Sequence, residues 1–225
     1  MLVSGLFLPL LLSTHYPCKI HGEATQRGGG GAMQSTQPMH AVFYAGLEGT
    51  GHHALEAMFL KEQKINPYLK SLKFTGNWKC GRTWDEAAIP DIRKIFEGIK
   101  HEPGIYTLPQ QESYPCGLGA RLPTMQHHPR LDWIAKAAKQ AEVPLKVLFL
   151  HRNLKDALIA SCAERHFESC EKESLHLKTS GKEMLRQLKT LPKESVACFM
   201  YGNRQAMTAA FKWAFHGNKD TVSEV

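Results

Sequence analysis

The segment Val42 to Phe59, VFYAGLEGTGHHALEAMF, constrains the fold of this chain more than any other stretch. An apolar run leads into three closely spaced glycines, Gly46, Gly49 and Gly51, and a helical pattern follows at once. Glycine lets the backbone turn tightly, so that successive N–H groups converge on one anion, and a helix N-terminus adds partial positive charge. The segment therefore predicts a strand, an anion-binding glycine loop and a helix.

The rest of the chain continues this alternation. The first strand is expected over 40–46, and the first helix over 52–64 has Leu55 and Phe59 on its apolar face. Further helices are predicted over 90–100, 130–141, 153–167, 181–192 and 203–215, and further strands over 104–109, 144–152 and 195–201. Strands that alternate with helices predict an α/β fold, with a central parallel sheet between helices on both faces.

The N-terminal part has a different composition. Residues 1–18 contain the apolar run MLVSGLFLPLLLS, which suits a signal-peptide core, a clipped signal-anchor or a simple hydrophobic tail. Residues 19–38 contain RGGGGA and are predicted to be a flexible linker. The folded domain is expected over 39–225. The secretory pathway is the favoured compartment, with the cytoplasm as the alternative.

Charge and cysteine content narrow the class of ligand. The formal net charge of +7 on 225 residues favours an anionic ligand, but the basic residues lack the aromatic spacing of RNA-binding modules, so no nucleic acid is expected. The six cysteines include no CxxC pair, which argues against zinc. Disulfides and buried free thiols both remain open, and Cys162 with Cys170 is the closest pair. His127 and His128 are predicted to lie in a surface loop rather than to bind a metal.

The glycine loop departs from that of a nucleotide hydrolase at its end. Gly46 and Gly51 have the four-residue separation of a Walker loop, but His52 and His53 occupy the places of its Lys and Ser or Thr. Imidazoles are mostly neutral at pH 7 and are poor magnesium ligands. The loop is therefore expected to hold its anion without a metal.

A second motif, LKVLFLHRNLKDALIASC, puts Arg152 at the end of a buried strand and Ser161 on the following helix. Together, the two motifs resemble the sulfotransferases that use 3′-phosphoadenosine-5′-phosphosulfate (PAPS), over about residues 40–215. The resemblance implies a P-loop-like three-layer α/β/α domain that moves a sulfuryl group to a hydroxyl or amine. It also implies a glycan or small molecule as acceptor, the Golgi lumen as location, and membrane association through residues 1–18.

The resemblance assigns roles to individual residues. The first loop would cradle the 5′-phosphosulfate through Gly46, Gly49, Thr50, Gly51 and His52. The second motif would bind the 3′-phosphate through Arg152 and Ser161. The acceptor's proton would go to His52, His53 or Glu56, because imidazole and carboxylate groups suit proton transfer. For each of these three, an ordinary place at a helix start or on a helix surface is the structural alternative.

Three features depart from the family pattern. Leu47 stands where the family has a lysine, and Glu48 within the loop is expected to face outward. Eight residues separate Arg152 from Ser161, one more than in the family, which turns a helical side chain by about 100°. The chain also ends at Val225, before a further cofactor-binding stretch, so the domain is expected to be incomplete there.

Two alternatives to a PAPS-dependent transferase stay open. The first is a catalytically impaired relative that binds a nucleotide or a sulfated glycan without turnover, which Leu47 favours. The second is a P-loop phosphotransferase, which the missing Lys and Ser or Thr disfavour.

Overall fold

The computed structural model describes residues 39–47, 49–72, 86, 89–108, 131–165 and 169–215. The N-terminal segment 1–18, the linker 19–38, Glu48 and the pair His127–His128 lie outside the described residues. Within the described part of the chain, no helix combines the length and the apolar character that crossing a membrane requires.

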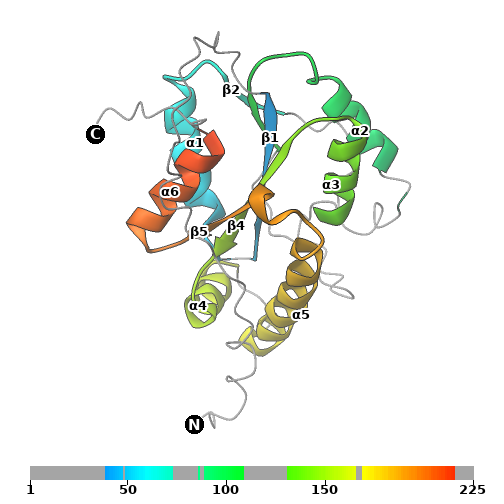
Figure 1. The fold of residues 1–225 in the computed structure, drawn as a ribbon. Coiled ribbons are helices and arrows are strands. Elements are labelled where there is room, and N and C mark those ends of the chain that lie inside the picture. Colours follow the sequence, from blue (N-terminus) through cyan, green and yellow to red (C-terminus); the bar gives the residue numbers. More distant parts are fainter. Residues whose placement is uncertain are drawn as a thin grey trace, which may run out of the picture.

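A single parallel sheet forms the centre of the domain (Figure 1). Its five strands follow the order β2-β3-β1-β4-β5. Their bounds are β1 His40–Gly46, β2 Leu69–Ser71, β3 Ile105–Thr107, β4 Leu145–His151 and β5 Val196–Met200. The central strands β1 and β4 pair along most of their length, with Gly46 opposite Leu150 at the carboxyl end. The predicted α/β fold with a central parallel sheet is confirmed.

Helices cover both faces of this sheet. Their bounds are α1 His52–Gln63, α2 Ile89–Glu97, α3 Leu131–Gln140, α4 Leu154–Arg165, α5 Cys170–Leu188 and α6 Arg204–Phe215, and a short 3₁₀ helix, η3, spans Lys193–Ser195. Helices α1 and α6 lie on one side of the sheet, and α2, α3 and α5 lie on the other (Figure 1). The domain therefore has the three layers of a P-loop-like α/β/α fold.

The core follows the two-residue period of the strands. In β1, Ala41, Phe43 and Ala45 pack with α2, α3 and α5, whereas Val42 and Tyr44 pack with α1 and α6. All five are at most 1% exposed. Because successive strand side chains point to opposite faces, a strand buried on both faces is apolar throughout, as the sequence of β1 is.

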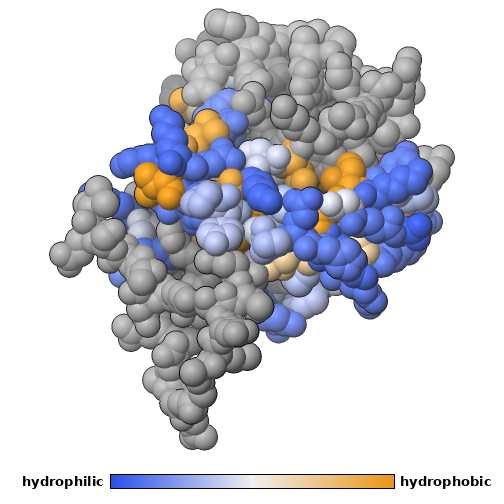
Figure 2. Space-filling view, turned by 90° about the horizontal axis from the view of Figure 1, so that it is seen from above, coloured by the Kyte–Doolittle hydropathy of each residue, from blue (hydrophilic) through white to orange (hydrophobic). Residues whose placement is uncertain are grey.

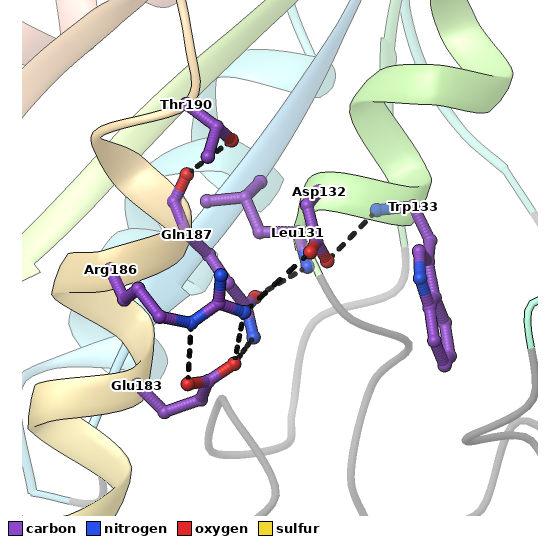
Figure 3. A network of polar contacts seen from close by, with 7 residues as sticks. All are labelled: Leu131, Asp132, Trp133, Glu183, Arg186, Gln187 and Thr190. Atoms are coloured by element: carbon purple, nitrogen blue, oxygen red, sulfur yellow. Dashed lines mark hydrogen bonds and ion pairs between the residues drawn. The ribbon is translucent and has the colours of Figure 1, made fainter.

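A polar network joins α3 to α5 (Figure 3). The backbone N–H of Leu131, at the start of α3, donates to the Gln187 side chain on α5 at 2.9 Å. Gln187 is fully buried and donates in turn to Glu183, which also pairs with Arg186. A helix start leaves backbone donors without intrahelical partners, so Gln187 supplies one of the missing acceptors.

The structure differs from the prediction in two places. The helix expected over 181–192 begins earlier, at Cys170. Its first half was not predicted, because it is polar and shows no apolar period. Strand β2 was not predicted, since LKS is only three residues long. Cys162 and Cys170 form a disulfide between α4 and α5, with their Cα atoms 5.5 Å apart, which decides between the two states left open for this pair.

Candidate anion site at the carboxyl edge of the sheet

The glycine loop forms a tight turn between β1 and α1. The Leu47 carbonyl accepts hydrogen bonds from the Thr50 backbone N–H at 3.2 Å and from the Thr50 hydroxyl at 2.6 Å. Gly49 and Gly51 have φ values of +73° and +104°, in the region that favours glycine. Thr50 is buried. Its hydroxyl proton is thus used inside the loop, and an anion would meet the backbone N–H groups of the loop and of the first turn of α1.

Close packing also requires the two glycines. A Cβ atom at Gly49 would lie 2.5 Å from the backbone oxygen of Ala157 in α4. A Cβ atom at Gly51 would lie 2.5 Å from the ring of Tyr201, which follows β5. The loop is therefore enclosed by α4 on one side and by Tyr201 on another, and side chains larger than hydrogen are excluded at both positions.

Arg152 lies at the same edge as this loop. It directly follows β4, and its Nη1 donates to the Gly49 carbonyl at 3.0 Å. The guanidinium also stacks on Tyr201, with Cζ 4.8 Å from the ring centroid. Asn153 directly precedes α4, and its side-chain oxygen accepts from the Lys155 N–H at 2.9 Å, as in an N-cap. The carboxyl ends of β1 and β4 thus bring the two sequence motifs together.

The three candidates for the proton acceptor occupy different surroundings on α1. His52 begins the helix and is buried, with its ring against Gly46, whereas His53 is exposed. Glu56 is half-buried, and burial and then the Glu56 charge raise the pKa of Tyr44 well above its ordinary value. His53 is therefore the most accessible of the three, and His52 serves the packing beneath the loop.

The Ser161 hydroxyl is directed to α5. Its hydroxyl donates to the Glu173 carboxylate on α5 at 2.5 Å, and both residues are buried. Ala157, one helical turn earlier on the same face of α4, is the residue that approaches Gly49. The predicted role of Ser161 toward a 3′-phosphate would require it to give up the hydrogen bond to Glu173.

The edge where the strands begin is also polar, but for a structural reason. His40 Nε2 lies 2.8 Å from the Ala214 carbonyl, and Lys146 Nζ donates to the Trp213 carbonyl at 2.6 Å. Both carbonyls belong to the last turn of α6, where they lack partners within the helix. Burial, and then the nearby Lys146 charge, lower the pKa of His40 to about 4. Lys146 is the second residue of the second motif but lies at the opposite end of β4 from Arg152.

The fold and this edge define a P-loop-like α/β domain in which the glycine loop, Arg152 and Tyr201 meet at the carboxyl edge of the sheet. Among the residues that the structure describes, no group of three or more His, Cys, Asp or Glu side chains is arranged to hold a metal ion.

Comparison with known proteins leaves the family open. No family model matches the chain, and no curated protein matches it. Similar solved structures include the Chaetomium thermophilum Kti12 in complex with ADP-AlF3, with 15% identity over 79% of this chain and 100% of that one, at a TM-score of 0.45. A shikimate kinase from Bacteroides thetaiotaomicron has 8% identity over 78% and 96%, at 0.43. A gluconokinase from Sinorhizobium meliloti has 12% identity over 79% and 95%, at 0.40.

These TM-scores are too low to carry a conclusion, so the fold class rests on the chain's own strand order and register. Tyr201 is the site residue that the sequence reasoning missed. The predicted strand over 195–201 ended on it, and an aromatic residue at the carboxyl end of a parallel strand lies at the edge where such sheets bind ligands.

Proposed function

We propose that this domain is a transferase that uses PAPS to sulfate a hydroxyl or amine acceptor. The observation that carries the proposal is the hydrogen bond from Arg152 to the Gly49 carbonyl, which joins a guanidinium to the glycine loop. Guanidinium groups bind phosphate and sulfate oxygens through paired, charge-assisted hydrogen bonds. A turn of backbone N–H groups, a helix N-terminus and an arginine together fit a ligand with two separate anionic groups.

The loop and Arg152 would divide the two ends of the nucleotide between them. The backbone N–H groups of Gly49, Gly51 and His52 would face the 5′-phosphosulfate, and Arg152 would reach the 3′-phosphate. When bound, PAPS supplies an activated sulfuryl group. The contribution of this chain would be to orient that group and to stabilise the charge that develops on it through fixed N–H donors.

The acceptor's proton would be taken by a group on α1. His53 is exposed at the start of the helix, and imidazole exchanges protons near neutral pH. His52 and Glu56 remain candidates. However, the ring of His52 packs against Gly46, so it would act from beneath the loop.

The residues that follow the loop favour transfer without magnesium. A Walker loop binds magnesium through the Ser or Thr hydroxyl two positions after its last glycine, where this chain has His53. Strand β3, next to β1, ends in Thr107 and continues into the buried Leu108, where this stretch of described residues ends, and from Ile105 to Leu108 it carries no carboxylate. We therefore propose that no metal is required.

A P-loop phosphotransferase is the second candidate. The spacing of Gly46 and Gly51 and the left-handed turn at Gly49 favour it, because both suit a loop that wraps a phosphate. A catalytically impaired relative that binds a nucleotide or a sulfated glycan is the third, since Leu47 brings no charge. We further propose a glycan or small-molecule acceptor, a Golgi location, and membrane attachment through residues 1–18, all from the family resemblance.

The test is a comparison of nucleotides by their effect on the melting temperature. Adenosine 3′,5′-bisphosphate is expected to raise it well above the effect of ADP or ATP, with or without magnesium, because the extra 3′-phosphate engages Arg152. A larger shift with ATP that depends on magnesium would support the phosphotransferase instead. No shift with any of the three would contradict nucleotide binding at this edge.

A further inference from the structure

The glycine loop contains no Lys or Arg, and Leu47 occupies the position at which the sulfotransferase family has a lysine. Its side chain is half-buried and packs against the apolar cluster formed with α2, α3 and α5. On α5, Gly181 is its neighbour, since a Cβ atom at Gly181 would lie 3.4 Å from Leu47 Cδ1, at ordinary van der Waals distance. Leu47 is thus part of the core, and its side chain is directed toward α5 rather than toward an anion in the loop.

Arg152 supplies positive charge to the loop from the neighbouring strand. Among the described cationic side chains, it is the one that forms a hydrogen bond with the loop, through Gly49 at 3.0 Å. A guanidinium has five N–H donors in a planar fork, and the contact with Gly49 uses one of them. Four donors remain, which is enough for paired hydrogen bonds to a second acceptor.

Tyr201 holds this guanidinium in place. Its ring stacks on Arg152 and also lies against Gly51, so the aromatic side chain contacts both the cation and the loop. The Tyr201 N–H donates to the His151 carbonyl at 2.8 Å, which extends the pairing of β4 with β5 by one residue. Arg152 is therefore fixed between the loop and a residue anchored to the sheet.

We propose that Arg152 binds the anion held by the glycine loop itself, and thereby replaces the charge that Leu47 does not provide. This inference rests on the proposed function and refines it. Arg152 would contact the 5′-side anion as well as a 3′-phosphate, so that one guanidinium serves both ends of the nucleotide. Lysine at this position would keep the charge but could not make paired hydrogen bonds to two anions.

The test compares two ligands that differ only in the 3′-phosphate. Titration calorimetry would measure adenosine 3′,5′-bisphosphate and adenosine 5′-monophosphate against the wild type, Arg152→Lys and Arg152→Gln. If Arg152 binds the loop anion, Arg152→Gln weakens both ligands by at least about tenfold. The bisphosphate should lose the larger factor, because it also loses the contact to its 3′-phosphate. Arg152→Lys should weaken both by a smaller factor.

Arg93→Gln is the matched control, because Arg93 lies on α2 in an exposed pair with Glu97 and should leave both affinities unchanged. Circular dichroism checks that each variant is folded. If Arg152→Gln does not fold, Arg152→Lys still provides the comparison. A loss confined to the bisphosphate, with the monophosphate unchanged, would overturn the inference and leave the proposed function standing. If both ligands bind the wild type equally and both are lost in Arg152→Gln, the inference stands and the preference for PAPS fails. No binding to the wild type would overturn both.

Discussion

The two edges of the parallel sheet both carry buried polar groups, but they use them differently. Where the strands begin, His40 and Lys146 bind the last carbonyls of α6. Where the strands end, Arg152 and the first turn of α1 lie beside a loop whose glycines have positive φ. The first edge uses polar side chains to complete a helix, whereas the second holds a cation beside backbone donors. Only the second has the composition of a ligand site.

The surface above the edge where the strands begin is polar. In the view from above, the described residues are mostly hydrophilic, with scattered apolar side chains (Figure 2). Exposed ion pairs contribute to that polarity, including Lys70 with Glu102 and Lys100 with Glu142. Exposed pairs of this kind contribute little to stability. We therefore expect substitutions at the carboxyl edge to change ligand binding, and substitutions at the edge where the strands begin to change stability.

The largest effect on binding is expected for Gly49→Ala. The new Cβ atom would lie 2.5 Å from the Ala157 backbone oxygen, and the residue has φ +73°. Clash and backbone strain together should raise the free energy of the native loop conformation by about 3–4 kcal/mol. The affinity for adenosine 3′,5′-bisphosphate should therefore fall at least about a hundredfold. Gly202→Ala is the control, since its φ is +88° but no atom lies within 4 Å of the added Cβ. Equal losses in both variants would show that strain alone, and not the fit to α4, matters.

A stability effect of similar size is expected at the opposite edge as the pH falls. The pKa of His40 is lowered from its ordinary 6.5 to about 4 in the folded state, so the unfolded chain binds a proton that the folded chain does not between these values. The free energy of unfolding should therefore decrease from pH 6.5 to 4, by at most about 3 kcal/mol, and His40 should contribute no further change below that range. Urea unfolding at several pH values measures it, with His40→Gln as the variant that lacks this titration. An unchanged pH dependence in His40→Gln would count against this assignment.

Ser161→Ala should affect folding more than binding. The variant removes a hydrogen bond to the buried Glu173 carboxylate, which should cost about 1–3 kcal/mol of stability. Affinity for adenosine 3′,5′-bisphosphate should change less than about twofold, because the hydroxyl is directed to α5. Ser195→Ala provides the comparison, since its hydroxyl bonds the Pro192 carbonyl at the surface. A tenfold loss of affinity with little change in stability would restore the predicted role of Ser161 at the 3′-phosphate.

The smallest effect is expected at Tyr201. Tyr201→Leu removes the ring that stacks on Arg152, which should weaken nucleotide binding by about fivefold, or roughly 1 kcal/mol. Tyr201→Phe keeps the ring and should bind almost as the wild type does. Titration calorimetry distinguishes them, and a loss of the same size in Tyr201→Phe would assign the effect to the hydroxyl instead.

The sequence predicted most of what local patterns encode. The apolar runs of β1, β4 and β5 identified buried parallel strands. Since such strands end at one edge of the sheet, the glycine loop and Arg152, which each follow a strand, share that edge. The short β2 and the polar first half of α5 were missed, because neither has an apolar period that distinguishes it from a loop.

The contacts between distant segments could not be predicted in the same way. Nothing in the spacing of Ser161 and Glu173, or of Leu47 and Gly181, indicates that these residues meet. Both contacts depend on how α5 packs against α4 and the sheet, which tertiary structure decides. Within the loop itself, the Thr50 hydroxyl bonds to the Leu47 carbonyl and the His52 ring lies against Gly46, although the resemblance assigned both residues to the ligand.

Amide chemical-shift mapping tests the difference between the two edges most directly. The protein would be titrated with adenosine 3′,5′-bisphosphate without magnesium, and the backbone N–H signals followed by NMR. Signals from Gly46, Gly49 to His53, Arg152 and Tyr201 are expected to shift with one binding curve, while those of His40, Lys146 and Ala214 stay in place. Shifts centred on the edge where the strands begin, or none at the glycine loop at saturating nucleotide, would contradict an anion site at the carboxyl edge.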